Sequence, residues 1–333
     1  LDENAEEYTR LIEVFKAHDI GYFFYNGGND SADTAYKVSQ ISKSLGYDLT
    51  CIAIPKTVDN DLAITDTCPG FGSVAKYVAI STQEASLDVQ SMMESSTKVF
   101  ILEVMGRHAG WIAGSSALAK RDKSDAPHII LLPEVTFNQT GFLKKVKDTV
   151  KKLGYCVVVA SEGVKNNRNK FLAEANTKDA FGHAQLGGVA PFLANLISQK
   201  IKLKNHWAVA DYLQRSARHI SSKVDLEHAE AVGRHAVKYA VKSMNGVMPV
   251  IKRKKTSKYS WEIVPAKLSK IANVEKKLPK SFITKDGFGI TKKGLDYFSP
   301  LIQGEGPIDY KNGLPKLERP KLILAKKKLP NWK

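Results

Sequence analysis

The chain has 333 residues, 43% of them hydrophobic, and a formal net charge of +16. This length allows two domains, and the composition is typical of a globular protein with a sizeable core. No apolar run reaches the roughly 18 residues that a membrane helix needs, and no signal-peptide pattern opens the chain, so we expect a cytoplasmic protein with no membrane partner.

The positive charge is concentrated in two clusters in the last third of the chain, residues 252–255 and 326–328. Neither cluster is interleaved with aromatic residues, which favours a solvated surface over a nucleic-acid partner. The cysteines Cys51, Cys68 and Cys156 are scattered without a CxxC pair. They predict neither a zinc site nor a disulfide framework.

Strand and helix patterns alternate as far as Gly246. The expected strands are residues 20–25, 49–54, 99–104, 128–132, 156–160 and 207–210. The expected helices are residues 3–17, a helix starting at Ser31, and residues 73–93, 112–120, 141–153, 189–201 and 226–241. This order is typical of a parallel α/β sheet, whose strands lack polar alternation because helices cover both faces.

After Gly246 the pattern changes. Residues 247–251 and 261–264 predict a hairpin, and Pro249 favours an edge position for its strand, because proline cannot donate to a ladder. Beyond Pro279 the chain is rich in glycine, proline and lysine, and we expect a tail that wraps the core.

A glycine-rich turn, Gly27-Gly28-Asn29-Asp30, follows the first expected strand. Two glycines let the backbone approach an oxyanion, and the helix that starts next directs free N–H groups toward it. Asn29 and Asp30 could bind a metal directly or through water. A purely structural strand-to-helix turn explains the pattern equally well.

The segment at residues 55–61 follows the second expected strand and contains Lys56, Thr57, Asp59 and Asp61. Phosphoryl transfer needs this mixture: one carboxylate takes the proton from the attacking hydroxyl, and carboxylates with phosphate oxygens hold Mg²⁺. A lysine neutralises the remaining charge. The alternative is an acidic loop that caps the next helix. Residues 66–73 resemble a second anion-binding turn into a helix.

Three further strand ends carry polar residues. Arg107 follows a glycine after the third strand and is placed to bind a sugar or phosphate, or else to pair with a surface carboxylate. We expect His108 beside it to be packed or solvated. Glu134 and Glu162 each follow a strand and could accept hydrogen bonds from sugar hydroxyls, cap a helix or form a salt bridge.

Taken together, these segments resemble the phosphofructokinase family over residues 21–218, and more loosely to the C-terminus. Residues 55–61 resemble the family's catalytic loop, in which glycine follows the proline in ATP-dependent members and lysine in pyrophosphate-dependent ones. Lys56 therefore points to the pyrophosphate-dependent type. The implied reaction moves a phosphoryl group from Mg-pyrophosphate to the 1-hydroxyl of fructose 6-phosphate. An ATP-dependent enzyme and a non-catalytic sugar-phosphate-binding subunit remain as alternatives.

The resemblance also implies a role for each matching residue. Asp59 would be the general base, Lys56 would stabilise the pyrophosphate, and Thr57 would contact the sugar. Asn29 and Asp61 would hold Mg²⁺. The residues implied to bind the sugar phosphate are Met105, Gly106, Arg107, Glu162, Tyr212 and Arg215. The residues implied to bind the donor are Gly28, Asp30, Lys56, Gly70 and Gly72.

Several positions depart from the family pattern. Asp30 stands where ATP-using relatives have a glycine, and its carboxylate would repel the α-phosphate of ATP. Asn29 replaces a metal-binding aspartate found in many relatives. Lys98 replaces an arginine that relatives supply across a subunit boundary, and Lys204 and His206 are candidates for a second. Such shared sites imply a homodimer or higher homo-oligomer.

The resemblance implies an α/β fold of two Rossmann-like lobes with mainly parallel sheets and an irregular C-terminal extension. Residues 1–72 with about 213–300 would form the donor lobe, and residues 73–212 with about 301–333 the fructose 6-phosphate lobe. Family members begin with a strand and a glycine-rich loop for the donor phosphates, and none precedes residues 3–17 here. We therefore expect a fragment that lacks this N-terminal segment.

Overall fold

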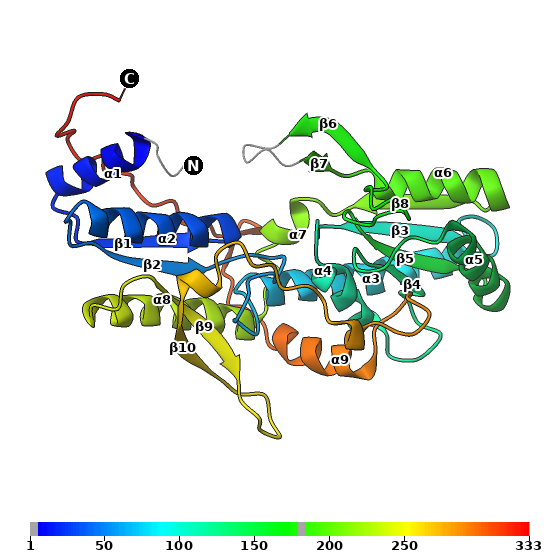
Figure 1. The fold of residues 1–333 in the computed structure, drawn as a ribbon. Coiled ribbons are helices and arrows are strands. Elements are labelled where there is room, and N and C mark those ends of the chain that lie inside the picture. The colour runs from blue at the N-terminus through cyan, green and yellow to red at the C-terminus, as the bar shows by residue number, and fades with distance from the viewer. Residues whose placement is uncertain (1–5, 179–183, 333) are drawn as a thin grey trace.

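The computed structural model describes residues 6–178 and 184–332, which form two lobes side by side (Figure 1). Each lobe is built on a four-stranded sheet. The expected α/β class with mainly parallel sheets is confirmed. No helix within the described residues is both long and apolar enough to cross a membrane.

The first lobe has the strand order β1-β2-β9-β10. Its strands are β1 (Tyr22–Gly27), β2 (Thr50–Pro55), β9 (Val247–Arg253) and β10 (Trp261–Lys267). β1 and β2 are parallel, whereas β9 and β10 form an antiparallel hairpin. Helices α1 (Glu6–Ala17) and α2 (Asn29–Ser44) lie over one face, and α8 (Lys223–Val241) covers the other (Figure 1). This double cover buries Cys51, Ile52 and Ala53 of β2, so the strand needs no polar alternation.

The second lobe has the strand order β4-β5-β3-β8, with every neighbouring pair parallel. Its strands are β3 (Val99–Val104), β4 (Ile129–Leu131), β5 (Cys156–Ser161) and β8 (Asn205–Val209). One core cluster packs α3 (Phe71–Met92) and α4 (Trp111–Ser115) on one face of the sheet. A second cluster packs α5 (Gln139–Leu153) and α6 (Val189–Ile201) on the other face.

The remaining elements are short. They are η1 (Ser116–Ala119), β6 (Glu174–Lys178), β7 (Ala184–Leu186), α7 (Leu213–Ser216), η2 (Leu268–Lys270), η3 (Lys280–Phe282), α9 (Lys292–Phe298), η4 (Ser299–Ile302), β11 (Tyr310–Lys311) and β12 (Leu314–Pro315).

The expected hairpin is confirmed, but the edge position inferred from Pro249 is wrong. β9 lies between β2 and β10, and β10 forms the edge. Proline fits inside the sheet here because β9 is registered with β2 at one pair only, Ile52 with Val247. Pro249 itself stands opposite Pro265 of β10, so neither residue offers an N–H to the other strand.

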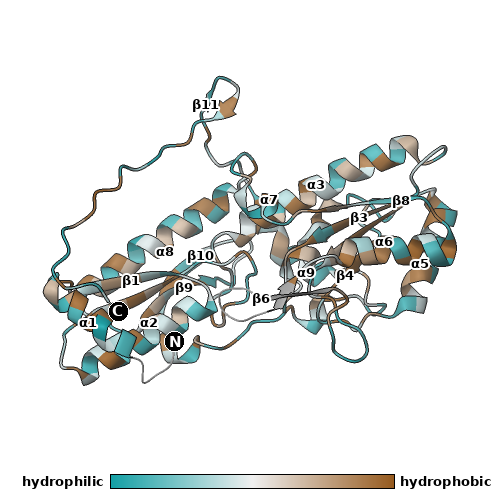
Figure 2. Ribbon diagram, turned by 90° about the horizontal axis from the view of Figure 1, so that it is seen from above, coloured by the Kyte–Doolittle hydropathy of each residue, from teal (hydrophilic) through white to brown (hydrophobic). Residues whose placement is uncertain are grey.

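The C-terminal tail divides its packing between the lobes. Phe282, Phe298 and Leu301 are buried in the cluster beneath α3 and α4. Residues 278–302 therefore pack on the second lobe, although residues up to 300 were expected in the first. The rest of the tail is mostly exposed and runs back toward α1 (Figure 2), where Arg10 donates a hydrogen bond to the carbonyl of Pro330.

Candidate active site

The carboxyl ends of the parallel strands in both lobes border one cavity of about 430 Å³. Ligands bind at this end of the strands in open α/β sheets. The cavity brings together most of the residues singled out from the sequence: Gly28, Asn29, Asp30, Thr57, Asp59, Asp61, Met105, Arg107, Glu162 and Arg215. They come from the turn after β1 and the first turn of α2, from the loops after β2, β3 and β5, and from α7.

The loop after β2 is held in shape by Asn60, between the two acids. Asn60 is buried and has a positive φ of 55°, a conformation that asparagine tolerates better than most residues. Its amide accepts from the N–H of Cys68 at 3.0 Å and donates to the hydroxyl of Tyr297 at 2.8 Å. With Asn60 anchored inward, Asp59 and Asp61 on either side both line the cavity.

Asp59 has a pKa raised to about 7, well above its ordinary value of 3.8. Burial is the largest cause, and the nearby carboxylates of Asp61 and Glu162 add to it. Arg107 and Lys56 oppose the shift. A carboxylate whose pKa lies near 7 is suited to accept a proton at neutral pH, because its basicity is high and it is still partly ionised.

The first turn of α2 presents unpaired polar groups beside this carboxylate. Gly28 precedes the helix and provides no side-chain cap. Asn29 Nδ2 and Oδ1 are both buried, and no residue in the described part of the chain hydrogen-bonds to either. An amide left without partners at a helix N-terminus, where N–H groups also point outward, indicates a place for a polar ligand.

Gly27, rather than Gly28, is sterically required in this turn. A Cβ on Gly27 would lie 1.9 Å from Ser31 Oγ, whereas a Cβ on Gly28 would meet ordinary contacts at 3.8 Å. Lys56 is exposed and does not line the cavity, but its charge lowers the pKa of Asp59.

In the second lobe, the loop after β3 is fastened to the loop after β5. The N–H of Gly106 donates to Glu162 Oε1 at 3.2 Å, and Gly106 has a φ of 135°. A Cβ there would lie 2.8 Å from the carbonyl of Ala109 and from Ser161 Oγ, so the close approach requires glycine. Gly106 thus positions Glu162, while Met105 and Arg107 on either side line the cavity.

The α7 segment contributes Arg215, whose guanidinium lies 3.9 Å from the centre of the Tyr212 ring. Tyr212 itself is 61% exposed and does not line the cavity. Gln214 between them is buried, accepts from the N–H of Met105 at 3.4 Å and donates to the carbonyl of Asp211 at 2.9 Å. Sequence patterns carry no signal for Gln214, because its contact with Met105 joins residues that only the fold brings together.

Gly70 and Gly72 do not form the anion-binding turn that the sequence suggested. The carboxylate of Asp225 accepts from the N–H of Gly70 at 2.9 Å and from the N–H and hydroxyl of Ser73 at 3.1 and 2.6 Å. The N-terminus of α3 is therefore already occupied by an internal anion. Gly72 is a packing residue, since a Cβ there would lie 2.6 Å from the carbonyl of Leu301.

Two other internal carboxylates have the same role. Glu134 accepts from the N–H groups of Gly110, before α4, and Leu278, both at 2.9 Å. Glu103 accepts from the N–H groups of Gly188 and Ala190, at the start of α6, at 3.1 and 2.8 Å. Glu134 is thus a helix cap, one of the alternatives left open by the sequence.

A strap at residues 275–278 crosses the edge of the cavity, and the sequence did not reveal it. His108 Nδ1 lies 2.5 Å from Glu275 Oε1, and both residues line the cavity. The N–H of Lys276 donates to the carbonyl of Asp61 at 2.6 Å. Within the described ranges, no cluster of three or more His, Cys, Asp or Glu side chains could hold a metal alone.

The fold and the cavity define a two-lobed α/β protein whose acidic loop, on one lobe, faces arginines on the other. The phosphofructokinase family model matches residues 1–240, and the chain belongs to this family.

A relative from Xanthomonas campestris pv. campestris (strain B100), named pyrophosphate–fructose 6-phosphate 1-phosphotransferase, is 58% identical over 334 residues. That match spans 100% of this chain and 80% of the relative. The structure is similar to a pyrophosphate-dependent phosphofructokinase from Nitrosospira multiformis, with a TM-score of 0.92, 56% identity and coverage of 99% of this chain and 79% of the other. The pyrophosphate-dependent phosphofructokinase from Marinobacter aquaeolei is also similar, with a TM-score of 0.90 and 55% identity. That match covers 97% of this chain and 78% of the other.

Proposed function

We propose that this protein transfers a phosphoryl group from Mg-pyrophosphate to the 1-hydroxyl of fructose 6-phosphate, giving fructose 1,6-bisphosphate and phosphate. The relatives at 55–58% identity carry the name of this reaction. The observation that carries the proposal is Asp59, a carboxylate with a pKa of about 7 in a cavity lined by residues of both lobes. The reaction is reversible and belongs to glycolysis and gluconeogenesis.

Asp59 accepts the proton of the 1-hydroxyl while the hydroxyl oxygen attacks the terminal phosphorus of pyrophosphate. The bond between that phosphorus and the leaving phosphate breaks on the side opposite the attacking oxygen. Lys56 neutralises charge on the leaving phosphate. Thr57 contacts the sugar, and its Oγ1 also accepts from the N–H of Asp59 at 3.1 Å, which fixes the base relative to the acceptor.

The sugar phosphate is held by the second lobe. Arg107 and Arg215 line the cavity and provide positive charge for the 6-phosphate. Tyr212 stacks on Arg215 and restricts its orientation. Glu162 Oε1 is engaged by Gly106, so its second oxygen is the acceptor for a sugar hydroxyl.

The chain fits a divalent metal between the first turn of α2 and the acidic loop after β2, and we propose Mg²⁺. The amide oxygen of Asn29 is buried with no partner among the described residues, and Asp61 lines the same cavity. Mg²⁺ prefers oxygen ligands and is held by one or two protein groups plus phosphate oxygens and water. When bound, it would neutralise charge on the pyrophosphate.

We also propose that the enzyme works in the cytoplasm as a homo-oligomer. β8 is an edge strand of its sheet, and its Trp207 and Val209 are 48% and 38% exposed. Exposed apolar residues gathered on one edge are typical of an interface. Light scattering that gives the mass of a single chain would rule this out.

Parallel assays with pyrophosphate and ATP test the donor. We expect turnover with pyrophosphate to exceed turnover with ATP at equal concentrations of fructose 6-phosphate and Mg²⁺. Faster turnover with ATP would support the ATP-dependent alternative. No product with any phosphoryl donor would support the non-catalytic sugar-phosphate-binding alternative.

A further inference from the structure

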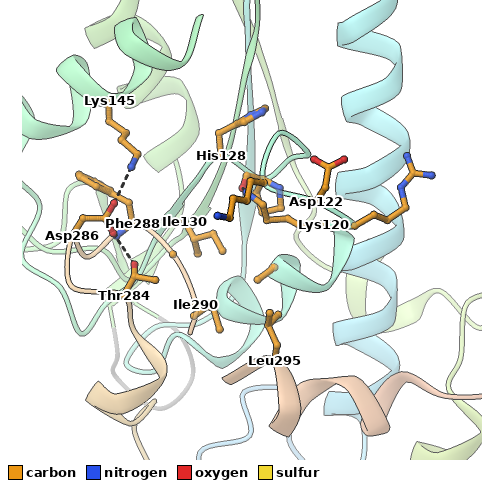
Figure 3. A pocket seen from close by; sticks show the side chains of 15 residues that line it. Lys120, Asp122, His128, Ile130, Lys145, Thr284, Asp286, Phe288, Ile290 and Leu295 are labelled. Carbon is orange, nitrogen blue, oxygen red and sulfur yellow. Dashed lines mark hydrogen bonds and ion pairs between the residues drawn. The ribbon is translucent and has the colours of Figure 1, made fainter. Parts of the chain in front are cut away.

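A second cavity, of about 440 Å³, lies at the outer edge of the second lobe and shares no lining residue with the catalytic cavity (Figure 3). Its inner wall is β4, the edge strand of the sheet, together with η1. Its outer wall is the tail segment at residues 284–295. The N–H of Ile130 donates to the carbonyl of Phe288 at 2.9 Å, which holds this segment along β4.

The surface of the cavity where these two walls meet is apolar. Ile130 is buried, and Phe288, Ile290 and Leu295 are half-buried around it. The volume lies within the range of about 300–1,000 Å³ that is typical of small-molecule sites. An apolar surface of this size favours a ligand with a hydrocarbon or aromatic body over an inorganic ion.

One side of the cavity carries an ion pair that is already satisfied. Lys145 Nζ lies 2.8 Å from Asp286 Oδ2, and Asp286 Oδ1 accepts from Thr284 Oγ1 at 2.7 Å and from the N–H of Phe288 at 3.2 Å (Figure 3). Partial burial would raise the pKa of Asp286, but these hydrogen bonds lower it to about 2. The pair therefore adds little net charge, and Asp286 has little capacity left to repel or bind a ligand.

Lys120, on the opposite wall in Figure 3, has no such partner. It is half-buried, and among the described residues Nζ donates only to the carbonyl of Pro127, at 3.2 Å. Burial lowers its pKa, the charge of Asp125 opposes this shift, and the charge of Lys145 adds to it. An ammonium group has three donors, so two remain.

The acids nearest to Lys120 are engaged elsewhere. Asp125 Oδ2 accepts from the N–H groups of Arg121 and Asp122 at 2.9 and 3.2 Å. Asp122 Oδ1 accepts from the N–H of Ser124 at 2.7 Å and from its hydroxyl at 2.5 Å. Both acids stabilise their own loop. Their charges still act on Lys120, but among the described residues neither acid forms a hydrogen bond with Lys120 Nζ.

We propose that this cavity binds a small organic anion, with its carboxylate or phosphate group at Lys120 and its apolar or aromatic body against Ile130, Phe288 and Leu295. The exposed residues Arg121, Asp122 and Lys123 at the rim together carry a net positive charge, which favours the approach of an anion. The site is separate from the catalytic cavity, so the proposal does not depend on the reaction assigned to the enzyme.

Phenyl phosphate is the probe, and binding to the full chain is measured by titration calorimetry with Mg²⁺, both without and with saturating pyrophosphate. We expect one phenyl phosphate per chain. Phenol lacks the anion and inorganic phosphate lacks the apolar body, so each should bind at least about 10-fold more weakly. Displacement of phenyl phosphate by pyrophosphate would place it in the catalytic cavity and overturn the proposal.

Two matched variants test the charge. Lys120→Met keeps the apolar stem and should weaken phenyl phosphate binding by about 10-fold or more, whereas Lys120→Arg should stay within about 3-fold of the parent. Should Lys120→Met fail to fold, Leu295→Glu on the half-buried face of α9 provides the second test, because it places a repelling carboxylate in the cavity. Unchanged binding in folded Lys120→Met or folded Leu295→Glu would refute the site.

Discussion

Asp59 is the residue on which the proposed chemistry depends most directly. Its pKa of about 7 predicts that kcat/KM rises with pH through about 7, because only the ionised carboxylate can accept the proton of the sugar hydroxyl. Asp59→Asn should lower kcat by about 10³-fold and leave the KM for fructose 6-phosphate within about 3-fold. Steady-state kinetics from pH 5 to 9 check both. A variant that retains parental kcat would remove Asp59 from the mechanism.

The same carboxylate should destabilise the fold above neutral pH. Its folded-state pKa exceeds the unfolded value of 3.8, so the native state holds its proton more tightly. The favourable contribution is present below pH 3.8 and is lost as the pH rises toward 7. Asp59→Asn removes the buried charge and should be more stable than the parent at pH 8 by about 2–4 kcal/mol. At pH 4 the two proteins should unfold at similar urea concentrations.

Asp30 and Lys56 test donor choice at the residue scale. Asp30 lines the cavity in the first turn of α2, and Lys56 is close enough to lower the pKa of Asp59. The double variant Asp30→Gly, Lys56→Gly removes a repulsion against ATP and an attraction for pyrophosphate. We expect kcat/KM for pyrophosphate to fall by about 10-fold or more and kcat/KM for ATP to rise. Undiminished turnover with pyrophosphate would argue against this account of selectivity.

At the scale of elements, three helix N-termini in the second lobe are stabilised by carboxylates from within the chain. At the start of α3, the carboxylate of Asp225 accepts hydrogen bonds from the N–H of Gly70 and from the N–H and hydroxyl of Ser73. Burial raises its pKa, and the hydrogen bonds from Ser73 and Gly70 oppose the shift. The N–H groups that surround the carboxylate therefore favour its charged form, while burial favours the neutral one.

Asp225→Ala should reduce the free energy of unfolding by about 2–4 kcal/mol, because the N–H groups of Gly70 and Ser73 lose their partner in a buried place. Asp225→Asn, which keeps one acceptor oxygen, should lose less. Urea unfolding measures both changes. Glu230, exposed on the same helix, is the control, and Glu230→Ala should change stability by less than about 0.5 kcal/mol.

These elements also show how far the sequence could predict the molecule. Alternation of apolar strands and helices predicted a parallel α/β sheet, and residues 55–61 predicted the acidic loop, because each depends on residues close in sequence. The division into two lobes was implied only by the family resemblance. Gly70 and Gly72 suggested a turn that binds an external anion. The carboxylate of Asp225, more than 150 residues away, occupies this place instead. Gln214 and Glu275 were missed for the same reason. Their roles depend on long-range pairing that one sequence does not encode locally.

For the whole molecule, the strap at residues 275–278 connects the acidic loop of the first lobe to the second lobe. Lys276 is the anchor: Nζ donates to the carbonyls of Thr65 and Asp66 at 2.9 and 3.2 Å and to Asn60 Oδ1 at 3.4 Å. Its own carbonyl accepts from Trp111 Nε1 of α4 at 2.8 Å. The position of Asp59 thus depends on contacts that span both lobes.

Lys276→Met tests this connection, because methionine keeps the length of the side chain but leaves the buried carbonyls of the loop short of donors. We expect a loss of about 2–3 kcal/mol of stability in urea unfolding. We also expect kcat to fall by about 10-fold, since small displacements of a general base lower the rate steeply. Lys277→Met, on the exposed neighbour, should change neither. A variant that loses stability but keeps parental kcat would mean that the strap supports the fold without fixing the position of Asp59.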